Sequence, residues 1–122
     1  MRIGLRPRGR AELIASLPAL AVLGVAVQGA LHAQTIEEKV KVAAGLYQIV
    51  YSPSSNTVYV ASVGERNANN AQIVELHGDT LERVDSIELP IPLYGLGLNE
   101  KTQTLYGTDT RAGNVVAIDL ET

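Results

Sequence analysis

Histidine is the main candidate for a reactive side chain, because the chain has two histidines and no cysteine. Without cysteine it can form no disulfide, thiolate metal site or cysteine nucleophile. His77 stands beside a glycine and an aspartate in a turn-like sequence, and no partner residue lies at metal-ligand spacing. A solvated turn histidine is the simpler interpretation, so we predict no metal site there.

Acidic and glycine-containing motifs also lack a catalytic pattern. Asp109, Asn114 and Asp119 do not have the spacing of a calcium loop. Gly95-Leu96-Gly97 lies inside an expected strand, whereas a phosphate loop opens a helix. The acidic residues Glu82, Asp85 and Glu88 are most simply explained as the solvent-exposed side of an outer strand. The sequence therefore predicts no catalytic residue, no metal and no cofactor.

The elements that would position functional residues belong to a sequence unit that occurs twice in the chain. Moving residues 46–60 forward by 47 positions places them on residues 93–107. Leu-Tyr then meets Leu-Tyr, Tyr59 meets Tyr106, and the two polar turns have equal length. A repeat of this kind predicts two copies of one supersecondary unit.

Each unit reads as short strands separated by turn residues. We predict strands at 47–52, 57–61, 72–76 and 81–89 in the first unit, and at 93–98, 103–108 and 114–120 in the second. Pro90 and Pro92 prevent the fourth strand from continuing. The spacing of the units falls from 47 to 42 after the second strand, which indicates a five-residue deletion in the next loop. Alternating polar and apolar residues predict one more short strand at Lys39–Ala43.

Four antiparallel strands at a period of about 40–45 residues are typical of a β-propeller blade. We predict an all-β chain with a lead-in at 34–44, a first blade at 45–91 and a second blade at 92–122 that lacks its fourth strand. Even four blades of about 40 residues need about 160 residues, so we expect an incomplete ring. The chain is then a fragment of a longer product, or copies assemble. Open strand edges and an uncovered apolar face favour self-association.

Residues 1–33 have the order of a signal peptide. Four arginines precede an apolar stretch at 13–27, and Ala33 is a small residue at the expected cleavage site. We predict a signal helix, Sec-type export to the periplasm or beyond, cleavage near Ala33 and no stable membrane anchor afterwards. A retained anchor is the alternative, but the apolar stretch is shorter than about 20 residues and contains Pro18.

Export would change the charge of the chain. The whole chain has ten basic and thirteen acidic residues. Cleavage after Ala33 removes four arginines and Glu12, which leaves six basic and twelve acidic residues. Because nucleic-acid affinity depends largely on neutralising phosphates, this balance argues against a nucleic-acid partner.

The second unit resembles a YVTN-type β-propeller repeat. The likeness rests on Pro92–Leu98, Thr104–Thr108 and Gly113–Thr122, and Val58–Ser62 is the equivalent of the signature strand in the first unit. The long loop after that strand is similar to the YncE-like periplasmic branch of the family. The resemblance implies propeller blades and is not specific for an activity.

The resemblance also implies a binding face. In propellers the loop that enters the innermost strand and the loop that joins the second and third strands share one face, where binding is expected. Tyr47 and Tyr94 take matching positions on it, and a tyrosine offers both an apolar ring and a hydroxyl. The candidate ligand-binding residues are Tyr47, Tyr94, Arg66, Asn67, Asn69, Asn70, Asp109 and Arg111. The alternative is that both tyrosines only pack between blades.

These observations favour an exported, non-enzymatic binding or scaffold module whose partner is a protein or a small molecule on the loop face. One alternative is part of a propeller enzyme, a lactonase or quinoprotein-like dehydrogenase, with its catalytic residues in other blades. Such an enzyme needs acids or metal ligands on the inner loops, where only Asp109 is available. The third hypothesis is a structural extracytoplasmic protein that binds no small ligand.

Overall fold

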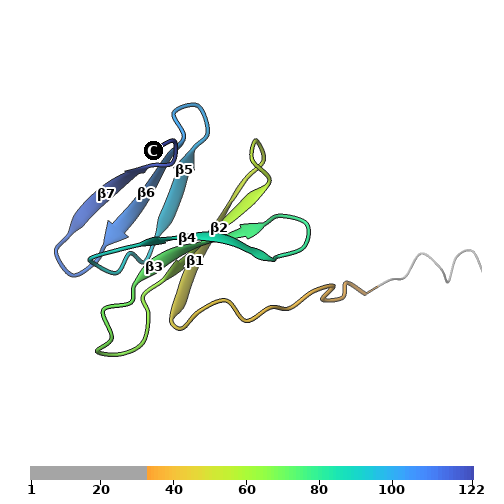
Figure 1. Ribbon diagram of the computed structural model, residues 1–122, viewed down its shortest axis with the longest axis horizontal. Helices are drawn as coiled ribbons and strands as arrows, with labels where there is room; N and C mark the ends of the chain where they lie inside the picture. The colour runs from red at the N-terminus through yellow and green to blue at the C-terminus, as the bar shows by residue number, and fades with distance from the viewer. Residues whose placement is uncertain (1–32) are drawn as a thin grey trace, which may run out of the picture. The chain divides into compact units, whose positions relative to one another are not determined.

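The computed structural model describes residues 33–122, which form two antiparallel β-sheets (Figure 1). The first sheet has the order β1 (Leu46–Ser52), β2 (Thr57–Ser62), β3 (Gln72–His77) and β4 (Arg83–Glu88). The second has the order β5 (Leu96–Asn99), β6 (Thr104–Asp109) and β7 (Asn114–Asp119). The predicted all-β class of blade-like sheets is confirmed, and the described residues close no ring. The predicted signal peptide and its helix fall on residues outside the described part.

The short strand predicted at Lys39–Ala43 is wrong. Residues 39–43 form no strand, and Val42 and Ala43 instead pack on one face of the first sheet. Gly45, with φ of 64°, turns the chain into β1, and the hydroxyl of Ser62 donates to the carbonyl of Ala44 at 2.7 Å. The alternating pattern is real, but two of its apolar residues, Val42 and Ala43, pack half-buried against a sheet face instead of being paired at a sheet edge, and Val40 stays exposed.

The two sheets repeat each other in register. A shift of 47 positions carries the cross-strand pair Ile49–Val60 of β1 and β2 onto the pair Leu96–Gly107 of β5 and β6. The pairs of β2 with β3 reappear in β6 with β7 after a shift of 42 in the third strand. This change of offset is what the predicted five-residue deletion requires. The alignment made from the sequence is therefore also an alignment of structurally equivalent residues.

The first sheet buries apolar side chains on both faces, because successive residues of a strand point to opposite sides. The cluster between the two sheets consists of Tyr59, Ala61, Ile73, Leu96 and Leu105. The cluster on the far face of the first sheet consists of Val58, Val60, Val74 and Leu76, with Val42 and Ala43 packed on it. The first cluster thus packs the two sheets together, and the lead-in covers part of the opposite face of the first sheet.

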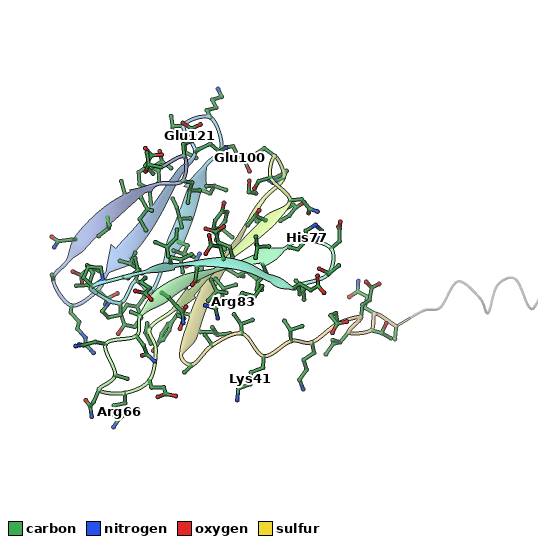
Figure 2. All side chains as sticks on the ribbon, in the orientation of Figure 1. Lys41, Arg66, His77, Arg83, Glu100 and Glu121 are labelled. Carbon is green, nitrogen blue, oxygen red and sulfur yellow. The ribbon has the colours of Figure 1, made fainter. Side chains whose placement is uncertain are left out.

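Two equivalent turns are linked at one end of the sheet pair. Asn56 and Gln103, 47 positions apart, both take a left-handed backbone with φ of 50° and 49°. Asparagine tolerates this conformation better than most residues, as the turn prediction assumed. The hydroxyl of Ser54 in the first turn donates to the Glu100 carboxylate in the second. Figure 2 shows Glu100 at this end and Arg66 at the opposite end of the sheets.

Candidate functional site

Loops from both sheets surround one cleft at the end opposite Glu100. The cleft has a volume of about 490 Å³. Four chain segments line it: the start of β1, the loop between β2 and β3, the connection from β4 to β5, and the turn between β6 and β7. Seven of the eight residues selected from the sequence are among its lining residues: Tyr47, Tyr94, Arg66, Asn67, Asn69, Asn70 and Arg111.

Tyr47 and Tyr94 meet across the two sheets. Their ring centroids lie 4.6 Å apart with an interplanar angle of 78°, an edge-to-face pair. Such a pair is worth about 0.5–1.5 kcal/mol beyond the area that it buries. Tyr47 still exposes 62% of its surface, so the pair packs between the sheets and also presents an aromatic surface to the cleft.

Backbone contacts hold Tyr94 in place. The amide of Tyr94 donates to the carbonyl of Thr108 at 3.0 Å, and the amide of Gly95 donates to the Thr108 hydroxyl at 2.8 Å. The segment before β5 therefore stays paired with β6 although the regular strand begins only at Leu96. The regular strand thus begins three residues later than the predicted start at residue 93.

Gln48 joins β1 to the second sheet beside the tyrosine pair. Its side-chain amide donates to the carbonyl of Leu96 at 3.2 Å. The equivalent position in the second unit is Gly95, so the repeat gave no signal for this contact. Leu89, Pro90 and Pro92 also line the cleft and were not selected from the sequence. Their apolar character was the available signal, since ligand sites are largely apolar.

The loop between β2 and β3 is shaped by its own polar side chains. The Asn70 side-chain oxygen accepts a hydrogen bond from the amide of Glu65 at 3.0 Å. Gly64, with φ of 79°, leaves the space that this side chain fills, because a Cβ atom there would overlap it. Asn67 takes a left-handed conformation with φ of 67°. The asparagines of this loop thus give it a defined shape, and Asn70 is partly a structural residue.

Two cations and one acid set the charge around the cleft. Arg66 extends from the tip of the β2–β3 loop (Figure 2), and Arg111 lies in the turn between β6 and β7. Glu65 is the acid among the lining residues. Within residues 33–122 neither guanidinium takes part in a hydrogen bond with another side chain. Both arginines are therefore available to an anionic group.

Asp109 is the one selected residue that does not line the cleft. It is only 6% exposed, and its carboxylate accepts the amide of Ala112 at 3.2 Å. The carbonyl of Asp109 accepts the amide of Gly113 at 2.9 Å. Asp109 therefore shapes the turn that carries Arg111, and it is removed from contact with any ligand in the cleft.

His77 and the acidic side chains of the described residues offer no metal site. His77 ends β3 as an exposed residue, and its Nδ1 accepts the amide of Asp79 at 3.3 Å. Within residues 33–122 no group of three or more histidine, aspartate or glutamate side chains could hold a metal ion. In the same residues, no helix has the length and apolar character needed to cross a membrane.

Two sheets with repeated register and a cleft formed by their loops define a pair of blade-like units of the β-propeller type. A scan of known protein families finds no match to this chain. The chain is similar to the YncE proteins of Escherichia coli O157:H7 and of Escherichia coli strain K12, with 30% identity to each over 99 residues. The match covers 79% of this chain and 28% of each of those proteins. The chain therefore spans less than a third of the length of the curated relatives that it matches.

Proposed function

We propose that this chain is part of an exported, non-enzymatic β-propeller binding module of the YncE-like type, and that its loop cleft takes a ligand. The carrying observation is the convergence of Tyr47, Tyr94, Arg66 and Arg111 on one cleft from loops of both sheets. A volume of about 490 Å³ falls within the range of about 300–1,000 Å³ that is usual for small-ligand sites.

The lining residues favour a ligand with a planar or apolar part and an acidic group. A flat ligand can pack on the exposed rings of the tyrosine pair, as tyrosines do in many recognition surfaces. A guanidinium presents donors in a fork that matches a carboxylate. Because Glu65 opposes the two arginines, one acidic group is a better match than a highly charged ligand.

Benzoate is a suitable first probe, with the neutral amide benzamide as its matched control. We expect benzoate to perturb the NMR signals of the cleft tyrosines and the benzamide effect to be several-fold weaker, because only benzoate can pair with a guanidinium. Tyr94→Ala should weaken benzoate binding about tenfold or more, which corresponds to about 1.4 kcal/mol. Arg111→Gln should remove most of the preference for benzoate over benzamide.

Two variants outside the cleft serve as controls. Tyr51→Ala removes a tyrosine of β1 that is 52% exposed and does not line the cleft. Lys101→Gln removes an exposed cation of the β5–β6 turn, which also lies outside the cleft. Both should bind benzoate like the unmodified chain. Equal weakening by Tyr51→Ala and Tyr94→Ala would contradict the proposed site.

Export is a separate part of this proposal and rests on residues 1–33. We expect the chain recovered from outside the cytoplasm to begin near Gln34, because a signal peptidase cleaves after a small residue such as Ala33. N-terminal sequencing of the exported protein measures this directly. An exported chain that still begins at Met1 would show that the signal is retained.

A further inference from the structure

The interface between the two sheets shows which surface each blade-like unit needs as a neighbour. On the first sheet it uses Tyr59, Ala61 and Ile73, which are 5%, 0% and 0% exposed. On the second sheet it uses Leu96 and Leu105, with Leu98 and Ile118 packed alongside. An aromatic and small-residue face of one unit thus packs on a leucine-rich face of the next.

The second sheet carries a copy of the first of these two faces. Tyr106, Thr108 and Val115 are the equivalents of Tyr59, Ala61 and Ile73, because the register of the two sheets repeats. We define the Tyr106 face as Gly97, Tyr106, Thr108, Val115 and Ala117. Tyr106 is 40% exposed and Val115 is 71% exposed, so this face has no neighbouring sheet in the described chain. A hollow of about 290 Å³ lies on it, between Gly97, Tyr106 and Val115.

The first sheet carries the equivalent of the leucine-rich face. Ile49, Tyr51 and Val58 lie 47 positions before Leu96, Leu98 and Leu105. We define the Ile49 face as Ile49, Tyr51, Val58, Val60, Val74 and Leu76. Ile49 and Tyr51 are 61% and 52% exposed. The described residues therefore present two different faces that are related as the two sides of their internal interface.

We propose that a second copy of this chain docks head to tail, its Ile49 face on the Tyr106 face of the first copy. The occupant is a second copy because the chain already forms one interface of this kind within itself, between strand positions that the repeated register makes equivalent. The contact joins two different surfaces, so the dimer keeps one free Ile49 face on one copy and one free Tyr106 face on the other. Association then continues beyond the dimer as the protein concentration rises.

The lead-in must leave for this contact to form. Val42 and Ala43 pack on the Ile49 face, where they take the place of part of the incoming sheet. Residues 39–43 form no strand, so their departure breaks no β-ladder. The incoming Tyr106 and Val115 cover more of the face than Val42 and Ala43 do, because Ile49 and Tyr51 remain exposed beside the lead-in.

Sedimentation velocity of the full chain over a range of concentrations tests the proposal with two single variants. Val115→Glu places a charge on the Tyr106 face, and Ile49→Glu places one on the Ile49 face. Both side chains are more than half exposed, so the fold should tolerate either change, and circular dichroism checks this. Each variant alone should associate at least about tenfold more weakly than the unmodified chain, because a buried unpaired charge is unfavourable. Ile36→Glu, at a residue that is 84% exposed and in neither face, is the matched control and should associate like the unmodified chain.

A mixture of the two variants distinguishes head-to-tail docking from any symmetric contact. The Ile49→Glu chain keeps an intact Tyr106 face, and the Val115→Glu chain keeps an intact Ile49 face. The mixture should therefore form a one-to-one heterodimer with no larger species, because the remaining pair of faces carries both charges. The proposal is overturned if the unmodified chain stays monomeric, if either variant associates as strongly as the control, or if the mixture gives no heterodimer.

Discussion

Tyr59 and Tyr106 occupy equivalent places in the two sheets, yet Tyr59 is 5% exposed and Tyr106 is 40% exposed. The strands around them have the same register, so local structure does not explain the difference. What differs is the neighbour, since the second sheet lies on Tyr59 and no described sheet lies on Tyr106. The burial of this tyrosine is therefore decided by whether a neighbouring sheet covers it and not by the register of its own sheet.

A second equivalent pair differs for a reason inside the sheet. Leu93 is fully buried, whereas Leu46 is 47% exposed. The residue equivalent to Val60 in the first sheet is Gly107 in the second, and the Leu93 side chain packs directly over that glycine. In the first sheet the equivalent position carries Val60 in place of a glycine, so the same space is not left open there. The absence of a side chain at Gly107 is therefore one condition for the burial of Leu93.

The largest effect should come from truncating the two equivalent tyrosines. We expect Tyr59→Ala to lower the free energy of unfolding by about 3–5 kcal/mol, because it opens a cavity between the sheets. Tyr106→Ala should cost less than about 1 kcal/mol, since a surface substitution leaves no cavity. Urea denaturation at a concentration low enough for monomers measures both. Equal losses would show that the neighbouring sheet does not explain the difference in burial.

The next effect comes from giving the second sheet the valine of the first. Gly107→Val should lower the free energy of unfolding by about 1–3 kcal/mol, because the new side chain overlaps the fully buried Leu93. In the double variant Leu93→Ala/Gly107→Val the closest overlap, with the Cδ1 atom of Leu93, is absent. A double-mutant cycle should therefore give a favourable coupling of about 0.5–3 kcal/mol between the two changes. Strictly additive losses would mean that the leucine can move aside freely.

Much of the fold followed from local patterns in the sequence. Runs such as Thr57 to Ala61 combine β-branched and aromatic residues, and turn residues such as Asn56 mark their ends, so strand and turn positions depend on nearby residues alone. The packing of the lead-in could not be predicted in this way. Alternation at 39–43 does not say whether an apolar side chain is buried by strand pairing or against a sheet face, because both use the same pattern.

Only part of the candidate site could be predicted from the sequence. The repeat placed Tyr47 and Tyr94 at equivalent positions, and the architecture placed four loops on one face. The structure brings those loops around one cleft. Asp109 was selected for its polar side chain in a loop of the predicted binding face. Its carboxylate instead accepts a hydrogen bond from the amide of Ala112 within the turn that it begins. The contact of Gln48 with Leu96 joins residues 48 positions apart, and no local pattern reports such a contact.

A smaller effect concerns Glu75, whose equivalent in the second sheet is Ala117. Burial raises the pKa of Glu75, and the carboxylate of Asp85 on the adjacent strand raises it further. The folded state therefore favours the protonated form, and stability is lost as the pH rises through this raised pKa. Glu75→Gln should stabilise the chain by a few tenths of a kcal/mol at pH 7, since the site is partly solvated. The gain should vanish below the ordinary value of about 4.5.

Asp85→Asn is the matched control for Glu75. It removes the repulsion but keeps the ionisable Glu75, so it should give part of the same stabilisation at pH 7. Thermal unfolding followed by circular dichroism between pH 3 and pH 8 measures both variants. A Glu75→Gln variant that is less stable than the unmodified chain at pH 7 would contradict the assigned burial effect.

The smallest effect, and one of opposite sign, is expected at Glu100 in the turn between β5 and β6. The hydroxyl of Ser54, and after it that of Ser52, lowers the pKa of Glu100 by stabilising its ionised form. This contribution is present above the ordinary value of about 4.5 and is lost as the pH falls through the lowered pKa. Glu100→Gln should therefore lower the thermal midpoint slightly at pH 7, and the difference should shrink as the pH falls below about 4.5. Ser54→Ala should reproduce this pH dependence, because it removes the donor that joins the turns of the two sheets. If the two variants differ in their pH profiles, the link between the turns does not set the pKa of Glu100.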